Sequence, residues 1–260
     1  VCRLFEDNAG KVSPNIRVIN LSIGIGDRLF YNMISPLAKL LDWLSFKYRV
    51  LFVVSAGNHN LDKIDLGMPF SSFKLLSDVD KHKQVIRILN RDSRSLKILA
   101  PSESMNSLTI GAVFQDSSNV NINSRQLLPG ENGHLSLISS IGSGINRSIK
   151  PDIVFNGGRN VLLQDPMNNH CGYWRKTGNN SPGILSAKPL NVRGGTASVG
   201  YSFGTSDSAA LISHNAAICY EILNNIFNNE TGSDIPKEHA SLLLKAMLVH
   251  GAKWDNNAND

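Results

Sequence analysis

The sequence is poor in cysteine, and its three cysteines form no recognisable motif. Cys2, Cys171 and Cys219 include no C-x-x-C pair and cannot all be bridged within one chain. This spacing excludes a disulfide framework and a zinc cluster built on cysteine pairs. It slightly favours a reducing compartment such as the cytoplasm, but a leader before Val1 would change this, so the location stays open.

Long apolar runs and blocks of like charge are also missing. No stretch approaches the roughly 18 to 20 apolar residues that cross a bilayer, and the first residues, VCRLFEDNAGKV, lack the basic flank and hydrophobic run of a leader. The formal net charge is only +5, with Lys and Arg scattered along the chain. We therefore expect neither a membrane nor a nucleic acid as partner.

Signals for cofactors are equally scarce. The stretch SIGIGDRL has Leu29 where the dinucleotide fingerprint needs its third glycine, and no P-loop Gly-Lys-Ser/Thr is present. A nucleotide-binding α/β domain is therefore a weak interpretation. Without a compact cluster of Asp and Glu there is no signal for calcium, and we expect no metal or other cofactor.

What the sequence does contain is an alternation of apolar, β-branched runs with amphipathic ones. The apolar runs predict strands over 16–24, 50–58, 107–113 and 150–158. The amphipathic runs predict helices over 35–48, from near Ser206 to about Asn224, and over 236–250, with a hairpin, VRGGTASVGYSFGTS, before the second helix. Strands that are apolar throughout are typical of a parallel sheet covered on both faces. We expect one α/β domain spanning 1–260, an open parallel sheet with helices on its faces.

Two segments interrupt this alternation and are expected to be insertions. Residues 61–99 are polar and charged, and Lys83, Arg87, Arg91 and Arg94 at near-helical spacing predict a solvated helix face. Residues 159–195 are rich in Asn, Gly and Pro, which predicts a long surface loop.

Polar and glycine residues follow the strands at the ends where open α/β sheets bind ligands. Ser22 and Gly24 follow the first strand, Gly57 and Asn58 the second, and Gly158 the last. A helix that begins near Ser206 and points at this crevice would offer unpaired N–H groups and the positive end of its dipole. With the Asn58 amide beside it, such a helix end suits a tetrahedral oxyanion.

Ser206 itself has two interpretations. In the stretch GTSDSAA it is either a helix cap or a nucleophile. Small residues that follow it would let the helix press close to the sheet; they are Ala209, Ala210, Ser213, Ala216 and Ala217.

The order of these blocks resembles that of the subtilisin-like serine peptidases, over nearly the whole chain. VINLSIG is similar to the family's cleft strand, VVSAGN to the strand that ends in the oxyanion asparagine, and SLTIGAV to its Val-Gly-Ala strand. ISSIGSGINRSIKPDIVFNGG is similar to the Ser-Ser-x-Gly and Lys-Pro-Asp-Ile stretch, and GTSDSAA to the block that holds the nucleophile. The resemblance implies a three-layer subtilisin-like fold and cleavage of protein or peptide substrates.

Carried over by position, the resemblance implies a role for each site residue. Ser206 would be the nucleophile, and Asn58 would share the oxyanion with the Ser206 N–H. Ser22 and Gly24 would pair with an extended substrate. A wall of the pocket for the residue before the scissile bond would be formed by Ser55, Ala56 and Gly57.

The sequence departs from the family where the base should be. The family's Asp-Ser/Thr-Gly and His-Gly-Thr blocks lie upstream of VINLSIG, and neither occurs here. His214 would lie about 12 Å along a helix from Ser206, so His59 is the one local substitute. Asp207 is a second departure, because a carboxylate beside the oxyanion would oppose its charge.

We therefore expect the chain to be the C-terminal part of a catalytic domain, incomplete and inactive alone. Its partner would be the upstream part, which supplies His, Asp and the strands next to VINLSIG. Otherwise the exposed strand edge would favour self-association. The alternative is a catalytically inactive binding or regulatory module that keeps the cleft without the base.

Overall fold

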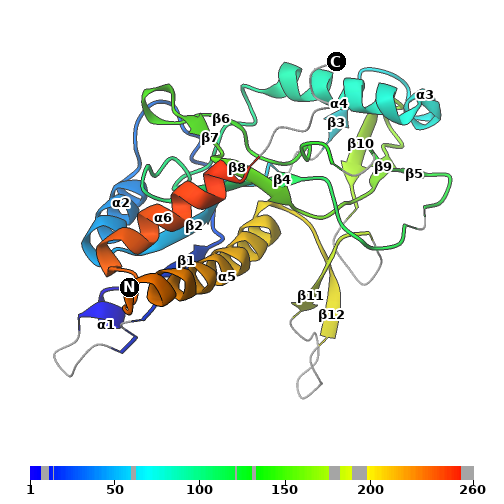
Figure 1. Ribbon diagram of the computed structural model, residues 1–260. Helices are drawn as coiled ribbons and strands as arrows, with labels where there is room; N and C mark the ends of the chain where they lie inside the picture. Colours follow the sequence, from blue (N-terminus) through cyan, green and yellow to red (C-terminus); the bar gives the residue numbers. More distant parts are fainter. Residues whose placement is uncertain are drawn as a thin grey trace.

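A computed structural model describes residues 1–6, 12–13, 15–59, 63–120, 122–130, 133–175, 182–188 and 198–252. Its centre is a parallel four-stranded sheet in the order β1-β2-β4-β8 (Figure 1). The strands are β1 (Val18–Leu21), β2 (Leu51–Ser55), β4 (Leu108–Val113) and β8 (Ile153–Asn156). All four lie inside predicted strands, so the α/β fold with a parallel sheet is confirmed.

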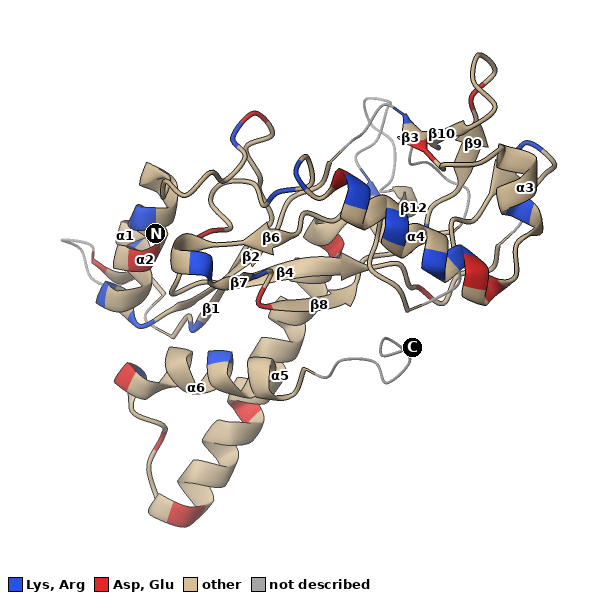
Figure 2. Cartoon of the chain, turned by 90° about the horizontal axis from the view of Figure 1, so that it is seen from above, with Lys and Arg blue, Asp and Glu red and all other residues tan. Residues whose placement is uncertain are grey.

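Helices cover both faces of this sheet, as the apolar character of β2 predicts. Leu51 and Val53 of β2 pack in one hydrophobic cluster with α5 (Thr205–Thr231) and α6 (Lys237–His250). Phe52 and Val54 pack on the other face with α2 (Pro36–Tyr48). Figure 2 shows the sheet between α2 on one side and α5 and α6 on the other.

Helix α5 contacts all four strands of the parallel sheet. It ends at Gly232, whose φ of 73° suits the left-handed conformation of a helix C-cap, well beyond the predicted end near Asn224. The predicted small-residue face is wrong in part, because Ala209 and Ala216 are buried whereas Ala210 and Ala217 are exposed. The buried residues of α5 are Thr205, Ser208, Ala209, Ile212 and Ala216.

The two expected insertions pair with each other in a second sheet. Its order is β3-β10-β9-β5, made of β3 (Ile64–Asp65), β10 (Cys171–Trp174), β9 (Leu162–Gln164) and β5 (Gln126–Leu127). The helices α3 (Phe70–Leu75) and α4 (Asp78–Asp92) belong to the same region. Its core includes Ile64, Phe70, Phe73, Val85, Ile88 and Leu162.

The structure of this region corrects one expectation and agrees with another. The described part of 159–195 forms strands β9, β10 and β11 (Ile184–Lys188) where a long loop was predicted; 176–181 and 189–195 lie outside the described residues. In 61–99, the charged helix face is present, since Lys83, Arg87 and Arg91 are exposed on α4. The opposite face of α4 is buried in the core. The two faces are distinct because side chains three or four residues apart lie on the same side of a helix.

Shorter elements complete the fold. They are α1 (Cys2–Phe5), β6 (Gly142–Ser143), the 3-10 turn Ile145–Arg147, β7 (Ile149–Lys150) and β12 (Ser198–Ser202). β12 pairs with β11, so the hairpin begins upstream of the predicted segment, whose residues 192–197 lie outside the described ones. The described cysteines are unpaired. None of the described helices is long and apolar enough to cross a bilayer.

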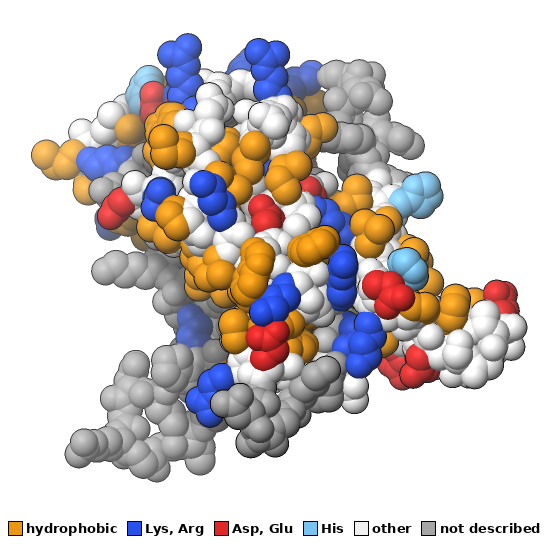
Figure 3. Space-filling model, turned by 90° about the vertical axis from the view of Figure 1, so that its left-hand side faces the viewer, with side chains coloured by type: hydrophobic (Ala, Val, Ile, Leu, Met, Phe, Trp, Pro, Cys, Tyr) orange, Lys and Arg blue, Asp and Glu red, His pale blue; other side chains and the backbone are white. Residues whose placement is uncertain are grey.

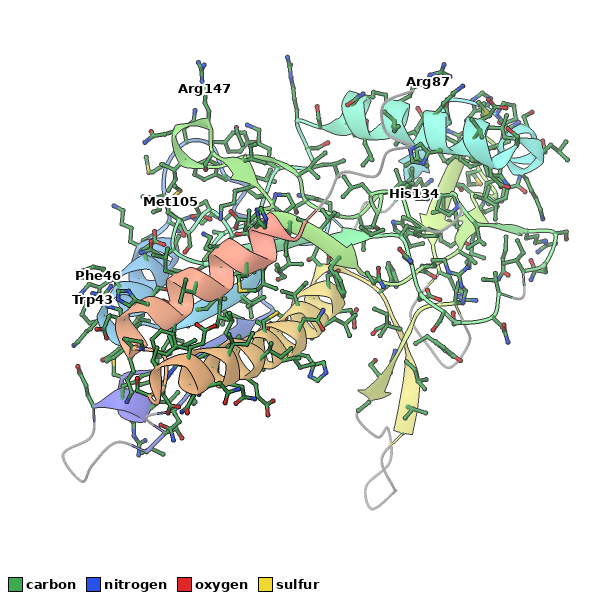
Figure 4. The ribbon with its side chains drawn as sticks, in the orientation of Figure 1. Trp43, Phe46, Arg87, Met105, His134 and Arg147 are labelled. Atoms are coloured by element: carbon green, nitrogen blue, oxygen red, sulfur yellow. The ribbon has the colours of Figure 1, made fainter. Side chains whose placement is uncertain are left out.

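Strand β1 forms one edge of the parallel sheet. Within the described residues it pairs with β2 alone. The outer side of α2 carries exposed apolar side chains, of which Trp43 and Phe46 point away from the ribbon in Figure 4. Figure 3, which views the molecule from this side, shows hydrophobic side chains spread between charged ones.

The contact between α5 and the sheet yields a matched pair of substitutions. Ala209 is 0% exposed against the sheet and Ala210 is exposed. We expect Ala209→Leu to lower the free energy of unfolding by about 1–3 kcal/mol, because the added atoms force the helix off the strands. Ala210→Leu should change it by less than about 0.5 kcal/mol. Urea unfolding measures both, and equal effects would contradict the packing described.

Candidate active site

The predicted site begins where the end of β2 meets the first turn of α5. The Thr205 backbone N–H donates to Asn58 Oδ1 over 2.9 Å, and the Thr205 hydroxyl donates to the same oxygen over 3.0 Å. That hydroxyl also accepts from the Gly57 N–H at 3.2 Å. Thr205 is 0% exposed, so these bonds are shielded from water. They fix the strand end and the helix start to each other.

The same bonds orient the Asn58 amide. Its oxygen accepts two hydrogen bonds, which leaves the Nδ2 donors on the opposite side of the group. Nδ2 lies beside Gly204, where a Cβ would come within 2.7 Å of it. Gly204 also has φ of 143°, in the region that favours glycine. A glycine is thus required here both by the backbone and by the amide next to it.

Ser206 is half-buried in the first turn of α5. Its carbonyl accepts from the Ser22 hydroxyl at 3.2 Å, so the structure brings Ser22 to the predicted nucleophile. No described residue hydrogen-bonds to Ser206 Oγ. The first N–H groups of a helix lack partners inside it, so the start of α5 is suited to hold a negative oxygen.

The described histidines do not supply a base to Ser206. His59 Nε2 makes a 2.7 Å hydrogen bond with the Lys97 carbonyl, which turns its ring to another part of the chain. His214 is exposed on α5. His134 stacks on Phe114 near the second sheet (Figure 4), and burial lowers its pKa. The substitute that the sequence suggested, His59, therefore has a different contact.

The predicted substrate-binding residues form two adjacent segments. The Ser55 hydroxyl donates to the Ile23 carbonyl at 3.3 Å, which ties 22–24 to 55–57. Gly24 is exposed, as a substrate-pairing strand requires. Ser55, Ala56 and Gly57 are all buried, so their backbones lie beneath a surface formed by other residues.

Asp207 is the acidic residue in the first turn of α5. Its Oδ1 accepts from the Ser202 hydroxyl at 2.7 Å, and Ser202 in turn lies 3.0 Å from the Ser186 hydroxyl. Burial raises the pKa of Asp207, against the opposing effects of the Ser202 hydrogen bond and the charge of Lys188. A carboxyl group that resists ionisation opposes a nearby oxyanion less than a charged one would.

Sequence reasoning missed Thr205 and Ser202. Both lie within the stretch SVGYSFGTSDSAA, but their partners are far away in sequence or depend on the hairpin β11–β12. Among the described residues, no group of three or more His, Cys, Asp or Glu could hold a metal ion.

Comparison with known proteins identifies one family that this chain matches. The model of the subtilase family, Peptidase_S8, matches residues 6–260. A search of curated proteins finds no match.

Several solved structures are similar over most of this chain. The prenylagaramide maturation protease PagA is 15% identical with a TM-score of 0.48, and the alignment covers 96% of this chain and 56% of that one. The patellamide maturation protease PatA is 17% identical with a TM-score of 0.46, covering 97% and 57%. A protease of Pseudoalteromonas arctica PAMC 21717 is 17% identical with a TM-score of 0.41, covering 88% and 43%. The chain thus spans about half the length of these proteins.

The junction at Thr205 yields the first prediction for this site. Thr205→Val keeps the shape of the side chain and leaves the buried Gly57 N–H without its acceptor. We expect the free energy of unfolding to fall by about 1–3 kcal/mol. Thr205→Ser, which keeps the hydroxyl, should lose less than Thr205→Val. Urea unfolding compares the two, and the reverse order would show that the methyl group matters more than the bonds.

The raised pKa of Asp207 yields a prediction about pH. The folded protein favours the protonated carboxyl, so ionisation costs stability as the pH rises above the ordinary range of an aspartate. Asp207→Asn avoids this cost. We expect the variant to be more stable than the parent at pH 7, with the difference closing at acid pH, where the parent is protonated both folded and unfolded. Unfolding curves over a pH series measure this; a difference that stays constant with pH contradicts it.

Proposed function

Because the chain belongs to the subtilase family of serine peptidases, we propose that it carries the nucleophile and oxyanion hole of a serine endopeptidase. The observation that supports this most is the double hydrogen bond from Thr205 to Asn58 Oδ1. It leaves the Asn58 Nδ2 donors on the other side of the amide, beside Gly204, two residues before Ser206. A backbone N–H and a side-chain amide held rigidly are the donors that an oxyanion needs.

The proposed reaction is acyl transfer from a peptide to Ser206 and then to water. Ser206 Oγ attacks the carbonyl carbon of the scissile bond as a base takes its proton. The carbonyl oxygen becomes negative, and the Ser206 N–H and Asn58 Nδ2 donate to it. The leaving amine takes the proton from the base, and water then releases the acyl group by the reverse sequence of proton transfers.

Ser22 and Gly24 are proposed to hold the substrate as an extended strand. Gly24 is exposed, and its segment is tied to β2 through the hydrogen bond from the Ser55 hydroxyl to Ile23. The 3.2 Å bond from Ser22 to the Ser206 carbonyl keeps this strand in register with the nucleophile. A substrate strand along 22–24 therefore places a carbonyl group near Ser206.

The base is proposed to come from outside the described residues. A His oriented by an Asp would complete the site, supplied by an upstream part of the same catalytic domain. The outer edge of β1 and the exposed apolar side chains of α2 offer surfaces for that part. On this proposal the 260-residue chain alone is inactive, and an unpartnered β1 edge would favour self-association.

A second candidate is an inactive binding or regulatory module with the same cleft. The observation in its favour is that none of the described histidines hydrogen-bonds to Ser206; His59 is held by the Lys97 carbonyl. Such a module would bind extended peptides without cleaving them.

Labelling with a fluorophosphonate probe separates these candidates. Three proteins are compared: this chain, the chain joined to any segment that its gene encodes before Val1, and the joined chain with Ser206→Ala. We expect labelling of the joined chain only, reduced at least about 100-fold by Ser206→Ala, because the probe needs an activated serine.

Ser213→Ala is the matched control for this experiment. Ser213 lies two turns further along α5, where its hydroxyl donates to the Ala209 carbonyl, so its loss should leave labelling unchanged. Labelling of the 260-residue chain by itself would mean that it contains its own base. A folded joined chain that never labels would favour the binding module.

A further inference from the structure

Leu99 lies between the two glycine segments that follow β1 and β2. Its N–H donates to the Ala56 carbonyl at 3.0 Å. On the other side, Ala100 N–H donates to the Arg28 carbonyl at 3.1 Å, and Phe30 N–H donates to the Ile98 carbonyl at 3.0 Å. The segment 98–100 is thus bonded to Ala56, directly after β2, and to residues 28 and 30 in the segment that follows β1.

The Leu99 side chain fills the space between these segments. A Cβ added at Gly57 would come within 2.6 Å of Leu99 Cδ1 and Cγ. One added at Gly24 would lie 3.4 Å from Leu99 Cδ1 and 3.5 Å from the Gly57 Cα. Leu99 is itself only 3% exposed. A Cβ at Gly24 would thus be in ordinary contact with Leu99, and one at Gly57 would overlap it, so the Leu99 side chain packs directly against both glycines.

We propose that Leu99 closes the pocket for the substrate residue before the scissile bond, so that the protein selects glycine or alanine there. This inference rests on the proposed function, and on the expectation from the sequence that 55–57 form a wall of the pocket for that residue. A larger side chain would need either to displace Leu99 from its packing or to stay in water.

The packing of Leu99 indicates that a larger substrate side chain would not simply push Leu99 aside on binding. The backbone on either side is held by the bonds from Leu99 to Ala56 and from Ala100 to Arg28, and the Leu99 side chain is buried, so another rotamer would have to displace its neighbours. Forcing extra carbon atoms into a packed site is costly. Differences of one methylene in an apolar pocket change specificity by roughly 10–200-fold.

The first arm of the test is a cleavage profile of the joined chain. The probes are fluorogenic peptides that differ only in the residue before the cleaved bond: Gly, Ala, Leu or Phe. We expect kcat/KM for Ala to exceed that for Phe by at least about 10-fold. Leu99→Ala and Leu99→Gly should raise cleavage after Leu relative to Ala by about 10-fold or more.

Leu96→Ala is the matched control, because it removes the same atoms from a buried leucine in the core of the second sheet. It should leave the Ala-to-Leu ratio unchanged. If Leu99→Ala fails to fold, the parent profile decides the question on its own. A parent that prefers Phe overturns the proposal.

The second arm is independent of catalysis. Fluorescence anisotropy measures the binding of labelled peptides, with Ala or Phe at the same position, to the joined chain with Ser206→Ala. Tighter binding of the Ala peptide, lost in the double variant with Leu99→Gly, supports the pocket even if no labelling is seen. Labelling at Ser206 with Phe preferred keeps the peptidase and rejects the pocket. No labelling and no binding of either peptide rejects both.

Discussion

The rest of the site depends on the hydrogen bonds that Thr205 makes with Asn58 and Gly57. They join the end of a buried strand to the start of the helix that covers the sheet. Because Thr205 is shielded from water, leaving any of these groups unpaired is costly, and the junction has one favourable arrangement. The orientation of the Asn58 amide and the place of Ser206 both follow from that arrangement.

The parallel sheet, its covering helices and the place of the candidate site could be predicted from the sequence. Strands such as LFVVS are apolar on both faces, which requires cover on both sides, and the helices that provide it show their own periodicity. The carboxyl ends of parallel strands meet along one edge, so Ser22, Asn58 and Ser206 could be expected near one another. The structure brings Ser22 to Ser206 and Asn58 to the residue before it.

What could not be predicted depends on contacts between distant segments. The second sheet joins β3 to β10 across more than a hundred residues, and two-residue strands such as β3 have no period to detect. The position of Leu99 is of the same kind, since nothing near KILAPS in the sequence points to Gly24 or Gly57. The predicted buried face of α5 differs from the observed one for another reason. Small residues lie on several faces of the helix, and composition does not tell which face meets the sheet.

Helix α5 has one further consequence for how such a site can change. The turn that begins with Thr205 and Ser206 belongs to the same rigid rod that contacts all four strands. A shift of α5 along its axis would move every one of its buried side chains out of its packing. The first turn of the helix therefore cannot move independently of the rest. Adaptation to new ligands is then easiest in the loops that border the strand ends, whose sequences can vary while the sheet and the rod remain as they are.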